Sequence, residues 1–178
     1  MMFGKLKQLA IASVLAIATV TGGAAPTYAA KADIELLQSY IGDWRGRGNA
    51  KLASTGEDET VLCKMNFTKS SGSKIGLNGR CSLAGTTLSM RGTVGYVEAA
   101  KRFEAVMSSN TSFQGVAIGK RRGKNLTFKL NNVKSDSNDA FDIAVALELK
   151  GGTINVRFDI LHKESGGKSF AIIPFKKN

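Results

Sequence analysis

Apolar and polar side chains alternate with a period of two along almost the whole chain after residue 42. Successive side chains of a β-strand point to opposite faces of a sheet, so this period predicts strands. Gly, Asn and Ser turns separate about ten such segments, and no connection is long enough to demand a crossover. The predicted strands are 43–53, 60–69, 74–84, 86–97, 101–109, 112–121, 124–133, 139–149, 152–161 and 168–176.

These strands predict an all-β domain that is either a barrel or a sandwich. We favour an antiparallel up-and-down barrel, because closing the sheet removes its exposed edges. One short helix is predicted before the strands, from Ala32 to Ile41, where Asp33 can cap its start and Gly42 its end. The length of 178 residues is that of one domain.

Residues 1–29 have the pattern of a secretory signal peptide. Two lysines precede an uncharged stretch from Leu9 to Val20, which is too short to cross a bilayer. We expect cleavage after Ala29, with a competing site after Ala32 and an uncleaved anchor as the alternative. The barrel would then be residues 30–178, without a transmembrane segment, in the periplasm or secreted.

The chain has two cysteines, Cys63 and Cys81, and both lie in the predicted exported part. An even number of cysteines in an oxidising compartment favours a disulfide over two buried thiols. If 60–69 and 74–84 form a hairpin in which Cys63 faces Cys81, then Val61 faces Leu83 and Phe67 faces Leu77. One register therefore satisfies both the apolar face and the disulfide.

The residues around Trp44 carry a resemblance to a known fold family. The stretch Ile41-Gly42-Asp43-Trp44-Arg45-Gly46-Arg47-Gly48 resembles the start of the calycin barrels, which include lipocalins, fatty-acid-binding proteins and nitrobindin-like barrels. In those barrels Gly-x-Trp opens the first strand after a helix that covers the barrel floor. The mature chain also resembles a group of small exported alphaproteobacterial proteins with this tryptophan and a cysteine pair. Trp44 is thereby expected to plug one barrel end, while Gly46 and Gly48 let the strand coil tightly.

No catalytic or metal-binding constellation can be assembled from the sequence. The chain has a single histidine, His162, and no spacing nominates a nucleophile or an acid–base pair. His162 and the acidic clusters offer too few ligands for zinc. The nitrobindin resemblance implies haem ligation by a histidine near the C-terminus, and the alternative is a solvated histidine at a strand end. We expect no cofactor and no enzymatic activity.

The net charge of +11 points to an anionic partner. Four basic residues crowd one predicted hairpin turn: Lys120, Arg121, Arg122 and Lys124. We expect them to splay outward, where they either bind an anionic envelope lipid, polysaccharide or host protein, or only add solubility. Nucleic acid is not expected, because no aromatic residues interleave the basic run.

The sequence thus leads to two hypotheses about function. In the first, the barrel is a non-enzymatic binding protein that holds a small apolar ligand against an inward face. The candidate ligand-binding residues are Trp44, Phe67, Leu77, Phe128, Phe141, Val145 and Phe158. In the second, the barrel is only a scaffold and the basic turn at 120–124 binds the partner.

Overall fold

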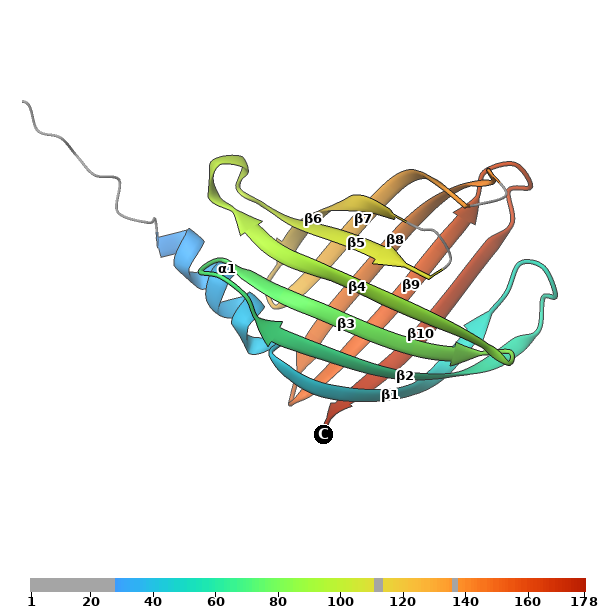
Figure 1. Cartoon of the computed structure of the whole chain (residues 1–178), viewed down its shortest axis with the longest axis horizontal. Coiled ribbons are helices and arrows are strands. Elements are labelled where there is room, and N and C mark those ends of the chain that lie inside the picture. The colour runs from blue at the N-terminus through green and yellow to red at the C-terminus, as the bar shows by residue number, and fades with distance from the viewer. Residues whose placement is uncertain (1–27, 111–113, 136–137) are drawn as a thin grey trace, which may run out of the picture.

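The structure is a computed structural model that describes residues 28–110, 114–135 and 138–178. One helix, α1 (Tyr28–Ser39), precedes ten strands that form a single closed sheet (Figure 1). The strands are β1 (Gly42–Lys51), β2 (Asp58–Lys69), β3 (Lys74–Leu83), β4 (Thr86–Val97), β5 (Arg102–Ser109), β6 (Gln114–Arg122), β7 (Asn125–Lys134), β8 (Ala140–Lys150), β9 (Thr153–His162) and β10 (Lys168–Lys177). A short 3-10 turn, Glu98–Ala100, connects β4 to β5.

Each strand pairs antiparallel with the next one in the chain, and β10 returns to pair with β1. This closing pair runs from Trp44 opposite Lys177 to Lys51 opposite Phe170. The predicted up-and-down barrel is confirmed, and the strand bounds differ from the predicted ones by two residues at most. The predicted start of the sixth strand, at 112 and 113, lies outside the described residues.

Close contact between β1 and β10 depends on two glycines of β1. A Cβ atom at Gly48 would lie 2.0 Å from the carbonyl oxygen of Ile172, and one at Gly46 would lie 2.7 Å from Cγ2 of Ile173. Both distances are well inside van der Waals contact, so a side chain at either position would push the closing strands apart. The expectation that these glycines allow tight coiling agrees with this geometry.

The β2–β3 hairpin has the register that the sequence predicts. Cys63 lies opposite Cys81, Val61 opposite Leu83 and Phe67 opposite Leu77. The two cysteines form a disulfide. The apolar face of the hairpin and the cross-link are therefore satisfied by the same alignment of strands.

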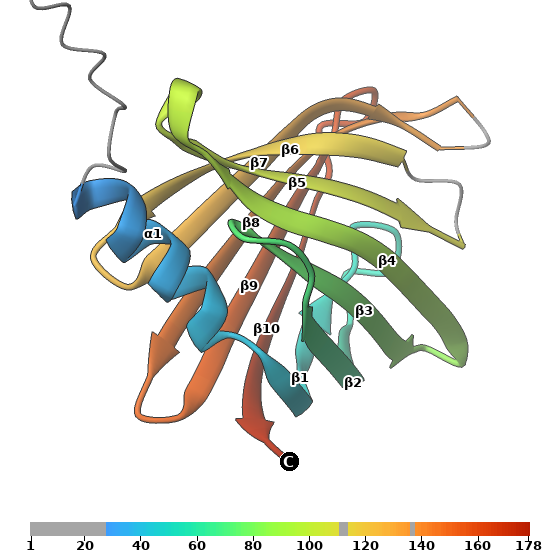
Figure 2. The ribbon, with the colours of Figure 1, turned by 60° about the vertical axis from the view of Figure 1, so that its left-hand side comes forward.

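Helix α1 begins at Tyr28, four residues before the predicted start. Asp33 is consequently inside the helix, so its predicted role as the cap is wrong, and its carboxylate instead bonds to Arg121. Leu37 and Tyr40 are buried at the end of the barrel that the helix covers (Figure 2). Most of the predicted signal peptide, residues 1–27, lies outside the described residues. In the part of the chain that is described, the helix is too short to span a bilayer.

The disulfide gives a first prediction. It closes a loop with a sequence separation of 18. Such a cross-link lowers the conformational entropy of the unfolded chain and so stabilises the folded protein by about 3 kcal/mol. Reduction of the wild-type protein should lower the free energy of unfolding by about this amount in urea denaturation. A Cys63→Ala/Cys81→Ala variant should show no further response to reductant. Identical urea midpoints for oxidised and reduced protein would contradict the cross-link.

Candidate functional site

The inside of the barrel contains an apolar cavity with a volume of about 470 Å³. Leu37 from α1 and Tyr40, the residue after the helix, form its floor. The opposite end is the mouth, where Leu52, Ser135 and His162 lie close to the strand ends. Six of the seven candidate ligand-binding residues line this cavity: Phe67, Leu77, Phe128, Phe141, Val145 and Phe158.

Trp44 lies outside the lining of the cavity. It is 2% exposed, and its Nε1 donates a hydrogen bond of 2.8 Å to the carbonyl oxygen of Tyr40. Lys177 Nζ lies 5.4 Å from the centre of the indole ring. Trp44 therefore supports the floor from below and connects the end of α1 to β1, as the plug interpretation expects.

Three methionines that sequence reasoning did not select also line the cavity: Met65 on β2, Met90 on β4 and Met107 on β5. Methionine is flexible and polarisable, so it adapts to ligands of irregular shape. Their inward positions follow from the alternation in each strand. The alternation alone did not distinguish a residue that faces open space from one that packs against another side chain.

A β-bulge shapes the cavity wall near the mouth. The register of β7 shifts between Leu130 and Val133, which are three residues apart yet both line the cavity. Asn132 has a φ of 55°, a conformation that asparagine tolerates better than most residues, and its N–H donates to Asp142 Oδ1 at 2.9 Å. The bulge returns Val133 to the inner face and so extends the apolar lining toward the mouth.

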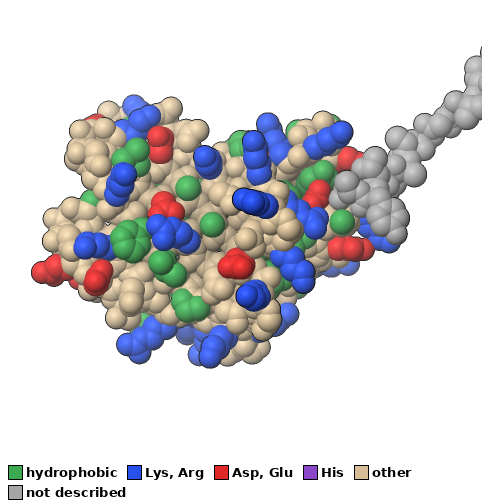
Figure 3. Space-filling view, turned by 180° about the vertical axis from the view of Figure 1, so that it is seen from behind, with side chains coloured by type: hydrophobic (Ala, Val, Ile, Leu, Met, Phe, Trp, Pro, Cys, Tyr) green, Lys and Arg blue, Asp and Glu red, His purple; other side chains and the backbone are tan. Residues whose placement is uncertain are grey.

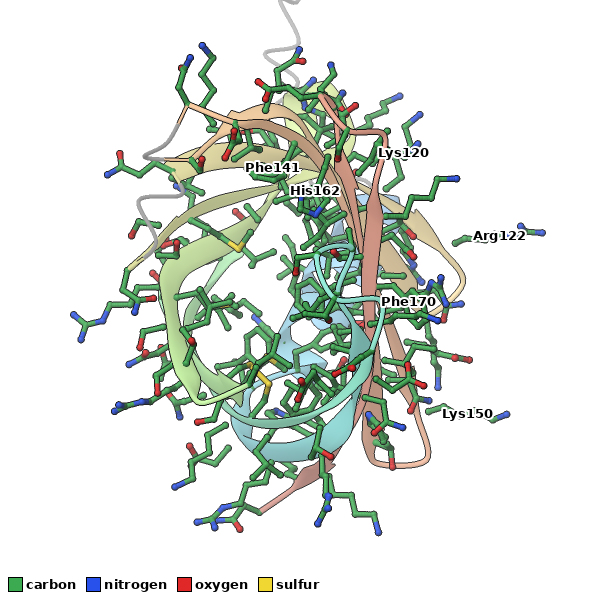
Figure 4. The ribbon with its side chains drawn as sticks, turned by 90° about the vertical axis from the view of Figure 1, so that its right-hand side faces the viewer. Lys120, Arg122, Phe141, Lys150, His162 and Phe170 are labelled. Carbon is green, nitrogen blue, oxygen red and sulfur yellow. A yellow bond between two sulfur atoms is a disulfide. The ribbon has the colours of Figure 1, made fainter. Side chains whose placement is uncertain are left out.

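His162 lies on the inner face of β9 at the mouth. Its Nε2 shares a hydrogen bond of 3.1 Å with Ser169 Oγ, which also accepts the Ala53 N–H at 2.9 Å. The Phe141 ring stands edge-on to the imidazole, with the centroids 5.0 Å apart (Figure 4). His162 is the last residue of β9, as expected, and is half-buried among these groups rather than fully solvated.

The mouth therefore offers polar groups above an apolar interior. His162 can donate or accept a hydrogen bond according to its tautomer, and Ser169 is a buried hydroxyl beside it. Haem, which the resemblance implies, would need an imidazole nitrogen that is free to bind iron. Nε2 shares a hydrogen bond with Ser169, so ligation of iron through this nitrogen would require that bond to break. In the described ranges, no cluster of three or more metal-ligating side chains occurs.

The predicted basic patch lies at the turn between β6 and β7, beside α1. Arg121 does not splay outward as expected: its Nη1 lies 2.7 Å from Asp33 Oδ1, and its Nε donates to the Gly123 carbonyl. Arg122 extends away from the barrel (Figure 4). Burial raises the pKa of the nearby Tyr96, and a hydrogen bond to Asp33 raises it further. The turn thus has a structural role in holding the helix.

Tyr40 joins the floor to the same turn. Its hydroxyl lies 3.4 Å from the carbonyl oxygen of Lys124, and burial raises the pKa of Tyr40 to about 12. The phenol is therefore neutral over the physiological range and adds no charge to the floor. The bottom of the cavity is apolar, and the polar atoms that line it lie near the mouth.

Comparisons with known proteins identify the fold alone. No family model and no curated protein matches the chain. The structure is similar to that of Rv2717c from M. tuberculosis, with a TM-score of 0.64, 12% identity, and coverage of 82% of this chain and 97% of that one. It is also similar to the S-type phycobiliprotein lyase CPES from Guillardia theta, with a TM-score of 0.59, 10% identity, and coverage of 83% and 96%. The chain is a calycin-like barrel.

The contact between α1 and the β6–β7 turn gives a second prediction. The side chains of Asp33 and Arg121 are 15% and 32% exposed, so their ion pair is partly screened from water. A double-mutant cycle with Asp33→Ala and Arg121→Ala should give a coupling energy of roughly 1 kcal/mol in thermal or urea unfolding. The more exposed pair Arg157–Asp159 is the matched control and should couple more weakly. Equal coupling in both cycles would mean that Arg121 does not hold the helix.

Proposed function

We propose that this chain is an exported, non-enzymatic binding protein that holds a small apolar ligand inside its barrel. The observation that carries the proposal is the 470 Å³ apolar cavity, which has a covered floor and a polar mouth. Side chains can fill a barrel of about eight strands, whereas ten strands leave room for a ligand. Ligand sites in proteins commonly have volumes of about 300–1,000 Å³.

Burial of apolar surface would drive the binding. Each square ångström of apolar surface removed from water contributes about 25 cal/mol, so a ligand that fills the interior gains affinity without charge pairing. The polar end of the ligand would lie at the mouth, where His162 and Ser169 can bond to it. Its apolar part would reach toward Tyr40 and Leu37 on the floor. An elongated amphiphile with a single polar end matches this division.

Two observations support a location outside the cytoplasm. The first thirty residues have the pattern of a signal peptide, and Cys63 and Cys81 form a disulfide. Disulfides persist in oxidising compartments such as the periplasm. We therefore propose that the barrel works in the cell envelope or in the surrounding medium.

We propose binding without catalysis because of the residues of the site, and not because of the activities of proteins with a similar structure. One neighbour is named a lyase, but at 10% identity the likeness extends to the fold only, and one fold serves many functions. The cavity of this chain is lined mainly by apolar side chains. The second hypothesis, a partner bound by the 120–124 turn, is weakened because the charge of Arg121 is paired with Asp33.

Filling the cavity tests the proposal. Ala105 lines the cavity and is 2% exposed, while its neighbour Val106 points outward and is 56% exposed. Ala105→Phe should abolish the fluorescence gain of the neutral apolar probe N-phenyl-1-naphthylamine, and Val106→Phe should retain it. Binding of the probe to the wild type should change little with salt, because no charge is involved.

Circular dichroism shows whether each variant remains a barrel, and Ala105→Leu replaces Ala105→Phe if the larger side chain prevents folding. Unchanged probe binding in a folded Ala105 variant would place the ligand elsewhere. Absence of probe binding to the wild type, together with absence of other apolar ligands, would refute the proposed function.

A further inference from the structure

Four basic side chains form a row across the outside of the barrel. Lys176 on β10 lies opposite Arg45 on β1, Arg45 lies opposite Lys64 on β2, and Lys64 lies opposite Arg80 on β3. All four side chains are exposed on the outer face. We call this row the basic strip: pairing of the consecutive strands β1, β2 and β3 aligns three of its residues, and closure of the barrel adds Lys176. The strip lies on different strands from the basic turn at 120–124.

The surroundings of the basic strip are basic and apolar. Arg47 follows Arg45 on the outer face of β1 and lies opposite Leu62 on β2. Leu62 is 51% exposed, and Ile172, further along β10, is 47% exposed. In the described strands β10, β1, β2 and β3, the acidic side chains are Asp43 and the pair at 58–59, at the start of β2. Asp43 is the one near the strip, and it accepts a hydrogen bond from Asn66.

Some basic residues elsewhere on the barrel have acidic partners. Arg102 pairs with Glu104 on β5, Arg157 pairs with Asp159 on β9, and Lys163 lies 3.8 Å from Asp142 of β8. Figure 3, which shows the molecule from behind, has acidic side chains interspersed among the basic ones. Within the described ranges, the salt bridges involve none of the four residues of the basic strip.

The row of like charges destabilises the isolated barrel. Like charges placed directly opposite each other on neighbouring strands repel and destabilise the sheet. These side chains point away from the core, so packing inside the barrel does not require a positive charge at any of the four positions. A partner that carries negative charge would remove the repulsion and convert the row into an attractive surface.

We propose that the outer face of β10, β1, β2 and β3 docks onto a bilayer that contains anionic lipid. The basic strip would bind the headgroup phosphates, since basic residues near an anionic membrane surface are attracted to it. Leu62 and Ile172, exposed near the strip, would enter the boundary between headgroups and acyl chains. These apolar side chains favour a bilayer over a hydrated polyanion. The face lies outside the cavity, so the proposal stands or falls separately from ligand binding.

Vesicle co-sedimentation tests the proposal with the full exported chain. Wild-type protein should sediment with vesicles of phosphatidylcholine plus phosphatidylglycerol, should not sediment with phosphatidylcholine alone, and should be released by high salt. The variant Arg45→Gln/Lys64→Gln/Arg80→Gln should bind about a hundredfold more weakly, at roughly fivefold per basic residue. The control Lys120→Gln/Lys129→Gln/Lys150→Gln makes the same change of charge on β6, β7 and β8 and should bind nearly as well as wild type.

The thermal midpoint at low salt is a second readout on the same variants. Loss of repulsion should leave the strip variant as stable as the wild type or more so, which shows that weak binding is not caused by unfolding. Equal vesicle binding by the strip variant and the control would overturn the proposal, because net charge and not the strip would then be responsible.

Leu62→Ser should also weaken vesicle binding. If it does not, and a soluble polyanion competes the protein from vesicles completely, the partner is a polyanion and the bilayer proposal is wrong.

Discussion

The backbone pairing of β1 with β10 turns ten strands into one closed wall. Gly46 and Gly48 allow this pairing, because a side chain at either position would meet β10. Closure removes both edges of the sheet and sends one set of alternating side chains into a shared interior. It also brings Lys176 beside Arg45 and Lys64 on the outside. The β1–β10 contact thus closes the cavity and adds the fourth residue to the basic strip.

The ends of the barrel differ because the chain covers only one of them with a helix. The Tyr40 hydroxyl and the Asp33–Arg121 ion pair connect the helical end of the chain to the β6–β7 turn, and Trp44 connects it to β1. At the other end, His162 and Ser169 bring polar atoms to the rim of an apolar space. The two ends of the cavity therefore differ: the floor is apolar, and the mouth can form a hydrogen bond with a polar group.

Local patterns in the sequence were sufficient for much of this structure. The alternation located ten strands, and the cysteines set the register of β2 and β3, because both signals act between residues that are close in the sequence. The position of the cavity lining followed from the same alternation. Contacts between distant segments left no such signal: the ion pair of Asp33 with Arg121 spans 88 residues, and it changed the expected roles of both. The partial burial of His162 was not predicted, because the alternation within a strand does not show its contact with Ser169 on the next strand.

The central claim is that the barrel interior receives an apolar ligand whose polar end lies at the mouth. A crystal structure of the protein grown with a long-chain amphiphile would test this claim most directly. We expect continuous ligand density between Phe67, Phe128 and Phe158, with the polar end within hydrogen-bond distance of His162 or Ser169. An interior closed by repacked side chains, with the amphiphile bound only on the outer surface, would contradict the account.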